Sequence, residues 1–443
     1  CSSATSTMRV RCRGTAVYCL ALLAVAHGLA APSPQALSPS LAPALCAAPR
    51  NAYLHLPFCR RRCFYCDFPI VVVGDGAERV DAAAEAYVAT LLREVRSAPR
   101  AVLGAAPLES VYFGGGTPSL TPPLLVHALV DELRGRYGLA PDAEVTLEMD
   151  PGTFDGAKLD AYIAAGVNRV SLGVQSFDED LLVACGRAHG VAEIEQALDL
   201  VRQRKLRLSV DLISGLPTQT AASWRESLRL AAASGAGHVS VYDLQVEAGT
   251  KFARLKDAGT LLQPGDDEAA SMFREASRAM GAAGFEHYEV SSYALQGQRS
   301  RHNSAYWLNS PFWGFGVGAT SHVDLRRVAR PRTLAEYGGW VSEAETFGWA
   351  AQQAQHGAFE DGVEAMQTRL MLALRTSDGV DVDALRAEGE IGAQAAIACL
   401  RAMQSIPKEW FDYTESRFKL TDPEGLLFSN TAIATVFAKL DPS

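Results

Sequence analysis

The sequence predicts an α/β protein: an incomplete barrel of six strand–helix units, (β/α)6, followed by a smaller, mainly helical C-terminal domain. Three observations support this prediction. Short β-rich runs alternate with helical segments from Asn51 onward, polar and glycine residues gather at the carboxyl ends of those runs, and the pattern changes after about residue 285. Strands separated by helix-length segments pair in parallel through right-handed crossovers.

Six runs rich in β-branched and aromatic residues predict the strands. They are AYLHL (52–56), SVYFGG (110–115), VTLEMD (145–150), RVSLGVQ (169–175), RLSVDLI (207–213) and HVSVYDL (238–244). Apolar residues at helical spacing between them predict helices over 80–96, 122–137, 155–165, 191–204 and 221–234. Six units are two short of a closed eightfold barrel, so we expect a lateral opening suited to a large substrate or partner.

The chain of 443 residues is longer than one ordinary domain. We expect a leader over 1–48, the partial barrel over 49–285 and a second domain over 286–443. The second domain begins where the sequence changes to HYEVSSYA and then RHNSAYWLNSPFWGFGVGATSH. Its last hundred residues, with LRTSDGVDVDALRAEG and FKLTDPEGLLFSNTAIATVFAKL, predict helices with a small strand or turn.

The leader has the composition of a targeting segment. From Met8, the expected start, a basic stretch precedes a short apolar run from Ala16 to Ala26, and an acid-free segment rich in Ser, Pro and Ala follows. The apolar run is too short to predict a stable membrane span. A signal-like stretch joined to a transit-like one predicts an organelle, with a plastid favoured and mitochondrial import or secretion as alternatives.

Bulk composition limits the classes of binding partner and argues against stabilisation by disulfide bonds. The net charge of −9 gives no indication of a nucleic-acid or anionic-membrane surface. Nine cysteines in 443 residues are too few and too scattered for a disulfide framework. We therefore expect free thiols in a reducing compartment or an organelle interior.

Three of those cysteines, Cys59, Cys63 and Cys66, lie together in HLPFCRRRCFYCDF, after the first predicted strand. Structural zinc normally takes four protein ligands, whereas an iron–sulfur cube held by three thiolates keeps one iron open for chemistry. The spacing favours the cluster. The alternative is zinc, with His55 or Asp67 as the fourth ligand.

Polar and glycine residues follow the next strands. Gly115, Gly116 and Thr117 belong to GGGTP, where the missing Cβ atoms let the backbone approach a ligand closely or simply form a tight turn. A further set forms a polar mouth able to hydrogen-bond a ligand; it comprises Glu148, Gln175, Arg187 and Asp211. Because a barrel gathers the carboxyl ends of its strands on one face, we expect these groups to meet.

These segments resemble the radical S-adenosylmethionine (SAM) superfamily, through C-x-x-x-C-x-x-C after the first strand. Within it, LEMDP, GVQSF and DLISGLP resemble the oxygen-independent coproporphyrinogen oxidase family. The resemblance implies a barrel of radical SAM type and a [4Fe–4S] cluster on the three cysteines. It also implies S-adenosylmethionine contacts from Tyr53, Tyr65, Gly115, Gly116, Thr117, Glu148, Gln175, Arg187 and Asp211.

Two branches of that family differ in chemistry. The decarboxylating enzymes carry a further cysteine two positions after the third, where this chain has Phe68; the heme chaperones have CDF, a Tyr-Glu-(Val/Ile)-Ser segment and H-N-x-x-Y-W, as here. The resemblance to the chaperones implies heme, heme-accepting apoproteins and a homodimer as partners. The alternative function is coproporphyrinogen III oxidation by a 5′-deoxyadenosyl radical.

His302, in HNSAYW, is the heme ligand that this resemblance implies. A neutral imidazole is a common axial ligand of heme iron, and neighbouring aromatic rings stack on a porphyrin. The alternative is a histidine with two aromatic residues buried between the two domains. The chain departs from the usual pattern at Ser300 and Ser292, where the family commonly has cysteine and asparagine.

Overall fold

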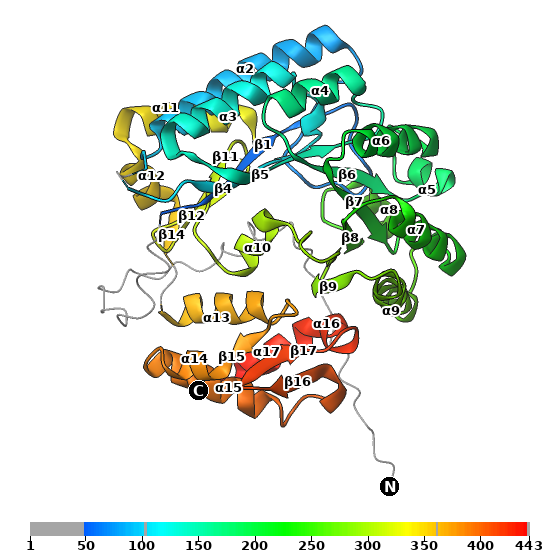
Figure 1. Cartoon of the computed structure of the whole chain (residues 1–443), viewed down its shortest axis with the longest axis vertical. Coiled ribbons are helices and arrows are strands. Elements are labelled where there is room, and N and C mark those ends of the chain that lie inside the picture. Colours follow the sequence, from blue (N-terminus) through cyan, green and yellow to red (C-terminus); the bar gives the residue numbers. More distant parts are fainter. Residues whose placement is uncertain (1–47, 102–103, 360–361, 441–443) are drawn as a thin grey trace.

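The computed structural model describes residues 48–101, 104–359 and 362–440. The targeting features expected at Met8 and in the apolar run lie outside the described residues. The described chain consists of a large sheet with helices on its outer face and a smaller helical part, which appear in the upper and lower halves of Figure 1. Within the described ranges, no helix combines the length and the apolar character needed to cross a membrane.

A nine-stranded sheet forms the larger part, in the order β11-β1-β4-β5-β6-β7-β8-β10-β9. Its six central strands are parallel neighbours in chain order, and the six predicted strands coincide with them. They are β1 (Asn51–Leu56), β4 (Leu108–Gly115), β5 (Leu139–Met149), β6 (Arg169–Gln175), β7 (Arg207–Ser214) and β8 (His238–Asp243). The predicted incomplete barrel of six units is therefore confirmed.

Three short strands from beyond residue 285 extend this sheet at its two edges. β11 (Trp313–Phe315) pairs in parallel with β1, while β10 (Ser292–Ala294) pairs antiparallel with β8 and with β9 (Glu286–Glu289). Strands of three or four residues are too short to show an alternating pattern, so they were not predicted. Through them, the segment after residue 285 is part of the barrel sheet.

Helices between the strands cover the outer face of the sheet (Figure 1). They are α2 (Ala77–Ser97), α3 (Pro123–Tyr137), α4 (Gly156–Ala164), α5 (Glu179–Ala184), α6 (Val191–Gln203), α7 (Ala221–Ala233), α8 (Lys251–Asp257) and α9 (Asp266–Ala282). Four of them, α4, α5, α7 and α8, begin at a side chain that accepts a hydrogen bond from the first turn, as where Asp155 accepts from the Lys158 amide at the start of α4. Later, α11 (Leu334–Phe347) packs on α2, and α12 (Trp349–His356) follows it.

Short elements connect these layers at the edge of the sheet. β2 (Phe58–Cys59) pairs with β3 (Val71–Val72), and the 3-10 helix η2 (Pro118–Leu120) follows β4. A separate sheet joins β12 (Thr320–Val323), β13 (Arg326–Ala329) and β14 (Gly357–Phe359). One buried apolar cluster extends from Ala52 to Trp349 and holds these parts together.

The C-terminal part has its own apolar core, in which Leu370, Val382, Cys399 and Phe418 are buried. The predicted helices surround a three-stranded sheet, where the sequence had indicated only a small strand or turn. The elements are α13 (Gly362–Ala373), β15 (Val380–Asp381), α14 (Val382–Arg386), α15 (Glu390–Ala402), η3 (Lys408–Trp410), β16 (Phe411–Thr414), β17 (Arg417–Leu420), α16 (Glu424–Leu427) and α17 (Ser429–Leu440). Between the two parts lies α10 (Arg301–Trp307), which contacts β4 and α13 (Figure 1).

Candidate functional site

The three clustered cysteines line one cavity of about 220 Å³ at the carboxyl ends of the barrel strands. Cys59 ends β2, and Cys63 and Cys66 lie in the loop that follows. The Thr117 hydroxyl donates to Cys59 Sγ over 3.6 Å, and Arg187 donates to Cys63 Sγ over 3.2 Å. All three are free thiols. The loop therefore presents three soft ligands to a single space, as an iron–sulfur cluster requires.

Burial makes ionisation of two of the three thiols costly. Burial raises the pKa of the Cys59 thiol far above its usual value and that of Cys66 to about 11. Without metal these two groups are neutral, and iron must displace their protons on binding. Among the described residues, no three His, Cys, Asp or Glu side chains are arranged to hold one metal ion. A cube differs from such a site because each thiolate binds a different iron atom.

His55, one of the two residues weighed as a fourth zinc ligand, lines a different cavity from the cysteines. Its Nδ1 lies 3.0 Å from the Tyr53 hydroxyl and its Nε2 lies 3.0 Å from the Pro69 carbonyl oxygen. With both ring nitrogens engaged there, His55 is not placed to complete a Cys3His zinc site.

The cysteine loop is held in shape by Arg62, whose guanidinium donates to three carbonyl oxygens within it. These are the carbonyls of Cys66, Phe68 and Ile70, at 3.1 to 3.3 Å. One side chain thus closes the loop on itself. Arg62 organises the backbone around the cluster cavity through these bonds.

The glycine turn lies directly against the cysteine loop. Gly115 has a φ of +121°, and a Cβ there would lie 2.6 Å from the His55 ring. A Cβ on Gly116 would lie 2.7 Å from the Phe58 carbonyl oxygen. The Thr117 amide donates to that same oxygen over 2.7 Å. Glycine is required at both positions because backbone meets backbone or ring there.

Two carboxyl groups face the same cavity from β5 and β7, the strands on either side of β6. Glu148 accepts hydrogen bonds from the Tyr112 hydroxyl (2.8 Å) and the Gly115 amide (3.1 Å), and burial raises its pKa from 4.5 to about 7. Asp211 accepts a 2.8 Å bond from Ser171, and burial raises its pKa as well. Near neutral pH, Glu148 is therefore able to accept or donate a proton at the cavity wall.

Arg187 joins the cysteine loop to the end of β5. It donates to Asp150 over 2.6 Å, to the Gly173 carbonyl over 3.0 Å and to the Tyr65 hydroxyl over 3.1 Å. Its Nε is buried without a hydrogen-bond partner among the described residues. The cavity thus has a buried cation beside Cys63 with one donor still to be satisfied.

The structure brings almost all of the predicted S-adenosylmethionine residues to this cavity. Its lining includes Tyr65, Gly115, Gly116, Thr117, Glu148, Gln175, Arg187 and Asp211. Gln175 has a φ of +66°, an uncommon conformation for a residue with a side chain. Tyr53 is the exception, because it lines the second cavity instead.

The second cavity, of about 170 Å³, adjoins the first and opens between α10 and the barrel. Asp67, Phe68, Gly115, Glu148 and Tyr242 line both cavities. The second is rich in aromatic rings and holds two arginines; its lining includes Tyr53, Tyr112, Tyr306, Trp307, Phe312, Arg327 and Arg332, together with His302 and Asn303.

His302 is buried in the wall of the second cavity, with 1% of its surface exposed. Its Nδ1 lies 2.8 Å from the Ser110 hydroxyl and its Nε2 lies 2.8 Å from the Tyr306 hydroxyl. The ring stacks on Tyr112 at a centroid distance of 5.1 Å. Burial, with a smaller effect of Arg169, lowers the pKa of His302 to about 3, so the imidazole is neutral.

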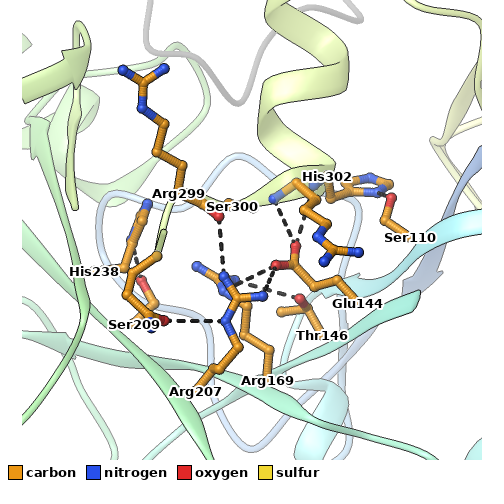
Figure 2. Close-up of polar contacts among 12 residues, drawn as sticks. Ser110, Glu144, Thr146, Arg169, Arg207, Ser209, His238, Arg299, Ser300 and His302 are labelled. Carbon is orange, nitrogen blue, oxygen red and sulfur yellow. Dashed lines mark hydrogen bonds and ion pairs between the residues drawn. The ribbon is translucent and has the colours of Figure 1, made fainter. Parts of the chain in front are cut away.

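The helix that carries His302 begins on a buried carboxylate of the barrel. Glu144 accepts from the backbone amides of Arg301 (3.0 Å) and His302 (3.3 Å), and Arg207 donates to the same carboxylate over 2.9 Å (Figure 2). Ser300, where the family commonly has cysteine, accepts from the Asn303 amide as the N-cap.

Several residues of both cavities were missed by sequence reasoning. Asp150, the partner of Arg187, lies two residues after Glu148 in LEMDP, so its position at a strand end was a usable signal. Tyr112 lies just before the glycine turn in SVYFGG, so its position near the end of a strand was also a usable signal. Arg327 and Arg332 come from a short strand and a loop far along the chain, and no pattern in the sequence indicated them.

Comparison with known proteins gives consistent results. The family model described as Radical SAM superfamily matches residues 53–231. A heme chaperone HemW of Synechocystis sp. is 39% identical over 411 residues, which cover 89% of this chain and 97% of that protein. The mitochondrial radical S-adenosyl methionine domain-containing protein 1 of Mus musculus is 36% identical, covering 74% and 73%.

A heme chaperone HemW of Escherichia coli is 36% identical over 62% of this chain and 70% of that protein. Among solved structures, the coproporphyrinogen III oxidase HemN of Escherichia coli superposes with a TM-score of 0.73 at 21% identity. The match covers 90% of this chain and 92% of that chain. At this identity the likeness concerns the fold, and it confirms a radical SAM barrel with an appended C-terminal part.

Proposed function

This chain belongs to the HemW family of heme chaperones within the radical SAM superfamily, and from that premise we propose that it binds heme and transfers it to apoproteins. Membership of the superfamily implies a [4Fe–4S] cluster and S-adenosylmethionine as cofactors. We assign the two cavities different tasks. The first holds the cofactors, and the second receives heme.

In the first cavity, Cys59, Cys63 and Cys66 would hold the cluster, which supplies an open iron for S-adenosylmethionine when bound. The protein's own groups then position the ligand. Glycines of the GGGTP turn allow close backbone approach, and carboxyl groups of Glu148 and Asp211 accept its donors. The Arg187 cation offsets the negative charge of the thiolates beside it.

In the second cavity, flat aromatic faces suit a porphyrin, and the neutral imidazole of His302 suits its iron. Arg327 and Arg332 line the same space and are able to pair with the two propionates. Here His302 acts as a ligand and the arginines orient the cargo. Because the cavity adjoins the first, the cofactors lie next to the heme site.

The observation that carries the proposal is the position of Phe68, which lines both cavities. The decarboxylating branch, by resemblance, has its additional cysteine there. In this chain a phenyl ring takes that position and adds an apolar surface between the two cavities. This favours heme handling over the coproporphyrinogen III oxidase alternative.

A transfer assay tests this function. Cluster-loaded protein carrying one equivalent of ferric heme is mixed with apomyoglobin, whose holo form has a distinct absorption spectrum. We expect myoglobin to form faster when Cys59, Cys63 and Cys66 are intact than in the triple alanine variant. Anaerobic conversion of coproporphyrinogen III to protoporphyrinogen IX, without heme transfer, would favour the oxidase instead.

We further propose delivery to an organelle and function as a homodimer. Two observations support delivery to an organelle. One is the composition of the leader, and the other is that similar proteins from Mus musculus, Bos taurus and Danio rerio are named as mitochondrial. The plastid remains our preference from the leader alone. Imaging a fluorescent fusion of the leader distinguishes the two organelles, and light scattering of the purified protein measures its oligomeric state.

A further inference from the structure

We propose that Asn51 and Ser110 are positioning residues that fix the tautomer of His302, directing its Nε2 lone pair toward the second cavity, and that Tyr306 is a displaceable cap on that nitrogen. The inference rests on the proposed function, in which His302 binds heme iron. It adds how the free protein keeps this ligand ready and protected.

The hydrogen bonds determine the tautomer. The Ser110 hydroxyl has one proton and donates it to Asn51 Oδ1 over 2.7 Å. At the 2.8 Å contact with His302 Nδ1, Ser110 must therefore accept, so the proton lies on Nδ1. Because the ring is neutral, Nε2 carries the lone pair and accepts from the Tyr306 hydroxyl over 2.8 Å.

Burial keeps this arrangement in place. Asn51 is 6% exposed, Ser110 is fully buried and His302 is 1% exposed. Water has little access to the ring to exchange its proton between the nitrogens. In the other tautomer, Nε2–H would face the Tyr306 hydroxyl and Nδ1 would be an acceptor. The Ser110 hydroxyl has already donated its proton to Asn51, so it could serve Nδ1 only by giving up that bond. One buried hydrogen bond would therefore be lost.

The backbone of His302 is fixed as well. Figure 2 shows Glu144 beneath the start of α10, where it accepts from the His302 amide, and Ser110 beside the imidazole. Ser110 comes from β4 and Glu144 from β5, so two adjacent barrel strands hold the residue at two points. The imidazole therefore has a fixed position and a fixed tautomer.

The cap is the contact of the imidazole that comes from a residue lining the second cavity. Tyr306 lies one helical turn after His302 and lines the same cavity. When heme enters, the Nε2 hydrogen bond to Tyr306 breaks and the iron–Nε2 bond forms, while the Nδ1–H bond to Ser110 remains. Histidines that bind metals commonly donate their other N–H in this way, and loss of such a partner typically costs about 10- to 100-fold in affinity.

The tautomer can be read without heme. In the full chain labelled with ¹⁵N-histidine, the resonances of His302 are identified as those missing from His302→Ala. We expect a protonated Nδ1 and an unprotonated Nε2 in the wild type, and a mixture of tautomers in Ser110→Ala. A protonated Nε2 in the wild type would overturn the inference.

Ferric heme titration tests the consequence. We expect Ser110→Ala to weaken binding about 10- to 100-fold and Tyr306→Phe to strengthen it roughly two- to tenfold, because the cap no longer competes. Ser234→Ala, which removes a buried hydroxyl at the end of α7, is the matched control and should bind as wild type does.

Wild-type affinity in Ser110→Ala, or weaker binding in Tyr306→Phe, would overturn the inference. If no variant binds heme although the expected tautomer is present, the proposed function fails instead. The two failures are distinct because the tautomer is measured in the absence of heme.

Discussion

Glu148 shows how burial gives a single residue its chemistry. It lies in the wall common to both cavities, and its pKa is raised from 4.5 to about 7. A carboxyl group with such a pKa changes charge close to physiological pH. The residue is thus placed to respond to what either cavity contains.

We predict a pH-dependent stability contribution from Glu148. Between pH 4.5 and 7 the folded protein holds this proton while the unfolded chain has lost it, so the free energy of unfolding falls as pH rises. The effect is at most about 3 kcal/mol, from the difference between 4.5 and about 7. Urea unfolding of cofactor-free Glu148→Gln should show a shallower decline over this range than the wild type; equal slopes would contradict the assignment.

A second residue-scale prediction concerns His302. Its pKa of about 3 means that the ring stays neutral, and the proton stays on one nitrogen, from pH 8 down to pH 5. The ¹⁵N resonances of His302 should therefore not titrate in this range. His127, which contacts Asp131 on α3, is an exposed histidine that lines neither cavity. A His302 midpoint near 6.5 would show that the ring is accessible to water.

At the residue scale, sequence reasoning found the groups that share a short motif. Cys59, Cys63, Cys66 and Glu148 follow strands at recognisable positions, and they line one cavity. It did not find Ser110 or Glu144, whose roles depend on contacts with a helix more than 150 residues later. Such contacts leave no local pattern, because the partner positions are set only by the folded barrel.

At the scale of elements, the glycine turn after β4 shows how backbone packing shapes the cofactor site. Gly116 lies against the carbonyl oxygens of Pro57 and Phe58. The turn and the cysteine loop therefore form one unit. Strand alternation predicted β4 and its turn correctly, whereas β9, β10 and β11 are too short for any periodicity.

We predict that Gly116→Ala destabilises this unit by about 1–3 kcal/mol, because its Cβ would lie 2.7 Å from backbone atoms. Binding of S-adenosylmethionine to the cluster-loaded protein, measured by calorimetry, should weaken in parallel. Gly135→Ala is the control: this glycine lies within α3 with nothing within 4 Å of an added Cβ, so the change should stabilise by up to about 1 kcal/mol. Equal effects of the two substitutions would contradict the close packing.

At the scale of the whole molecule, the two cavities connect parts of the chain that fold on different cores. The C-terminal part meets the barrel through Arg274 and Glu424, at 2.6 Å, and through His287 and Asp422, at 2.7 Å. α10 lies between the two parts and carries His302 (Figure 1). Leu372 of α13 lines the second cavity together with residues of the barrel, so the proposed heme site draws on both parts.

We predict that the two cavities bind their ligands separately. No cysteine of the described residues lines the second cavity, so a triple variant with alanine at Cys59, Cys63 and Cys66 should contain no cluster iron yet still bind ferric heme. Iron analysis before heme is added measures the cluster, absorption spectroscopy after heme is added measures heme binding, and circular dichroism checks the fold. Loss of heme binding in a folded triple variant would show that the cluster is part of the heme site.

The central claim is that His302 binds heme in the second cavity, and a titration of ferric heme into the cluster-loaded full chain tests it most directly. The wild type and His127→Ala should each bind one heme per chain with the absorption band of a histidine-ligated iron, and His302→Ala should lose that band. Unchanged spectra in His302→Ala, or a wild type that binds no heme, would contradict the account.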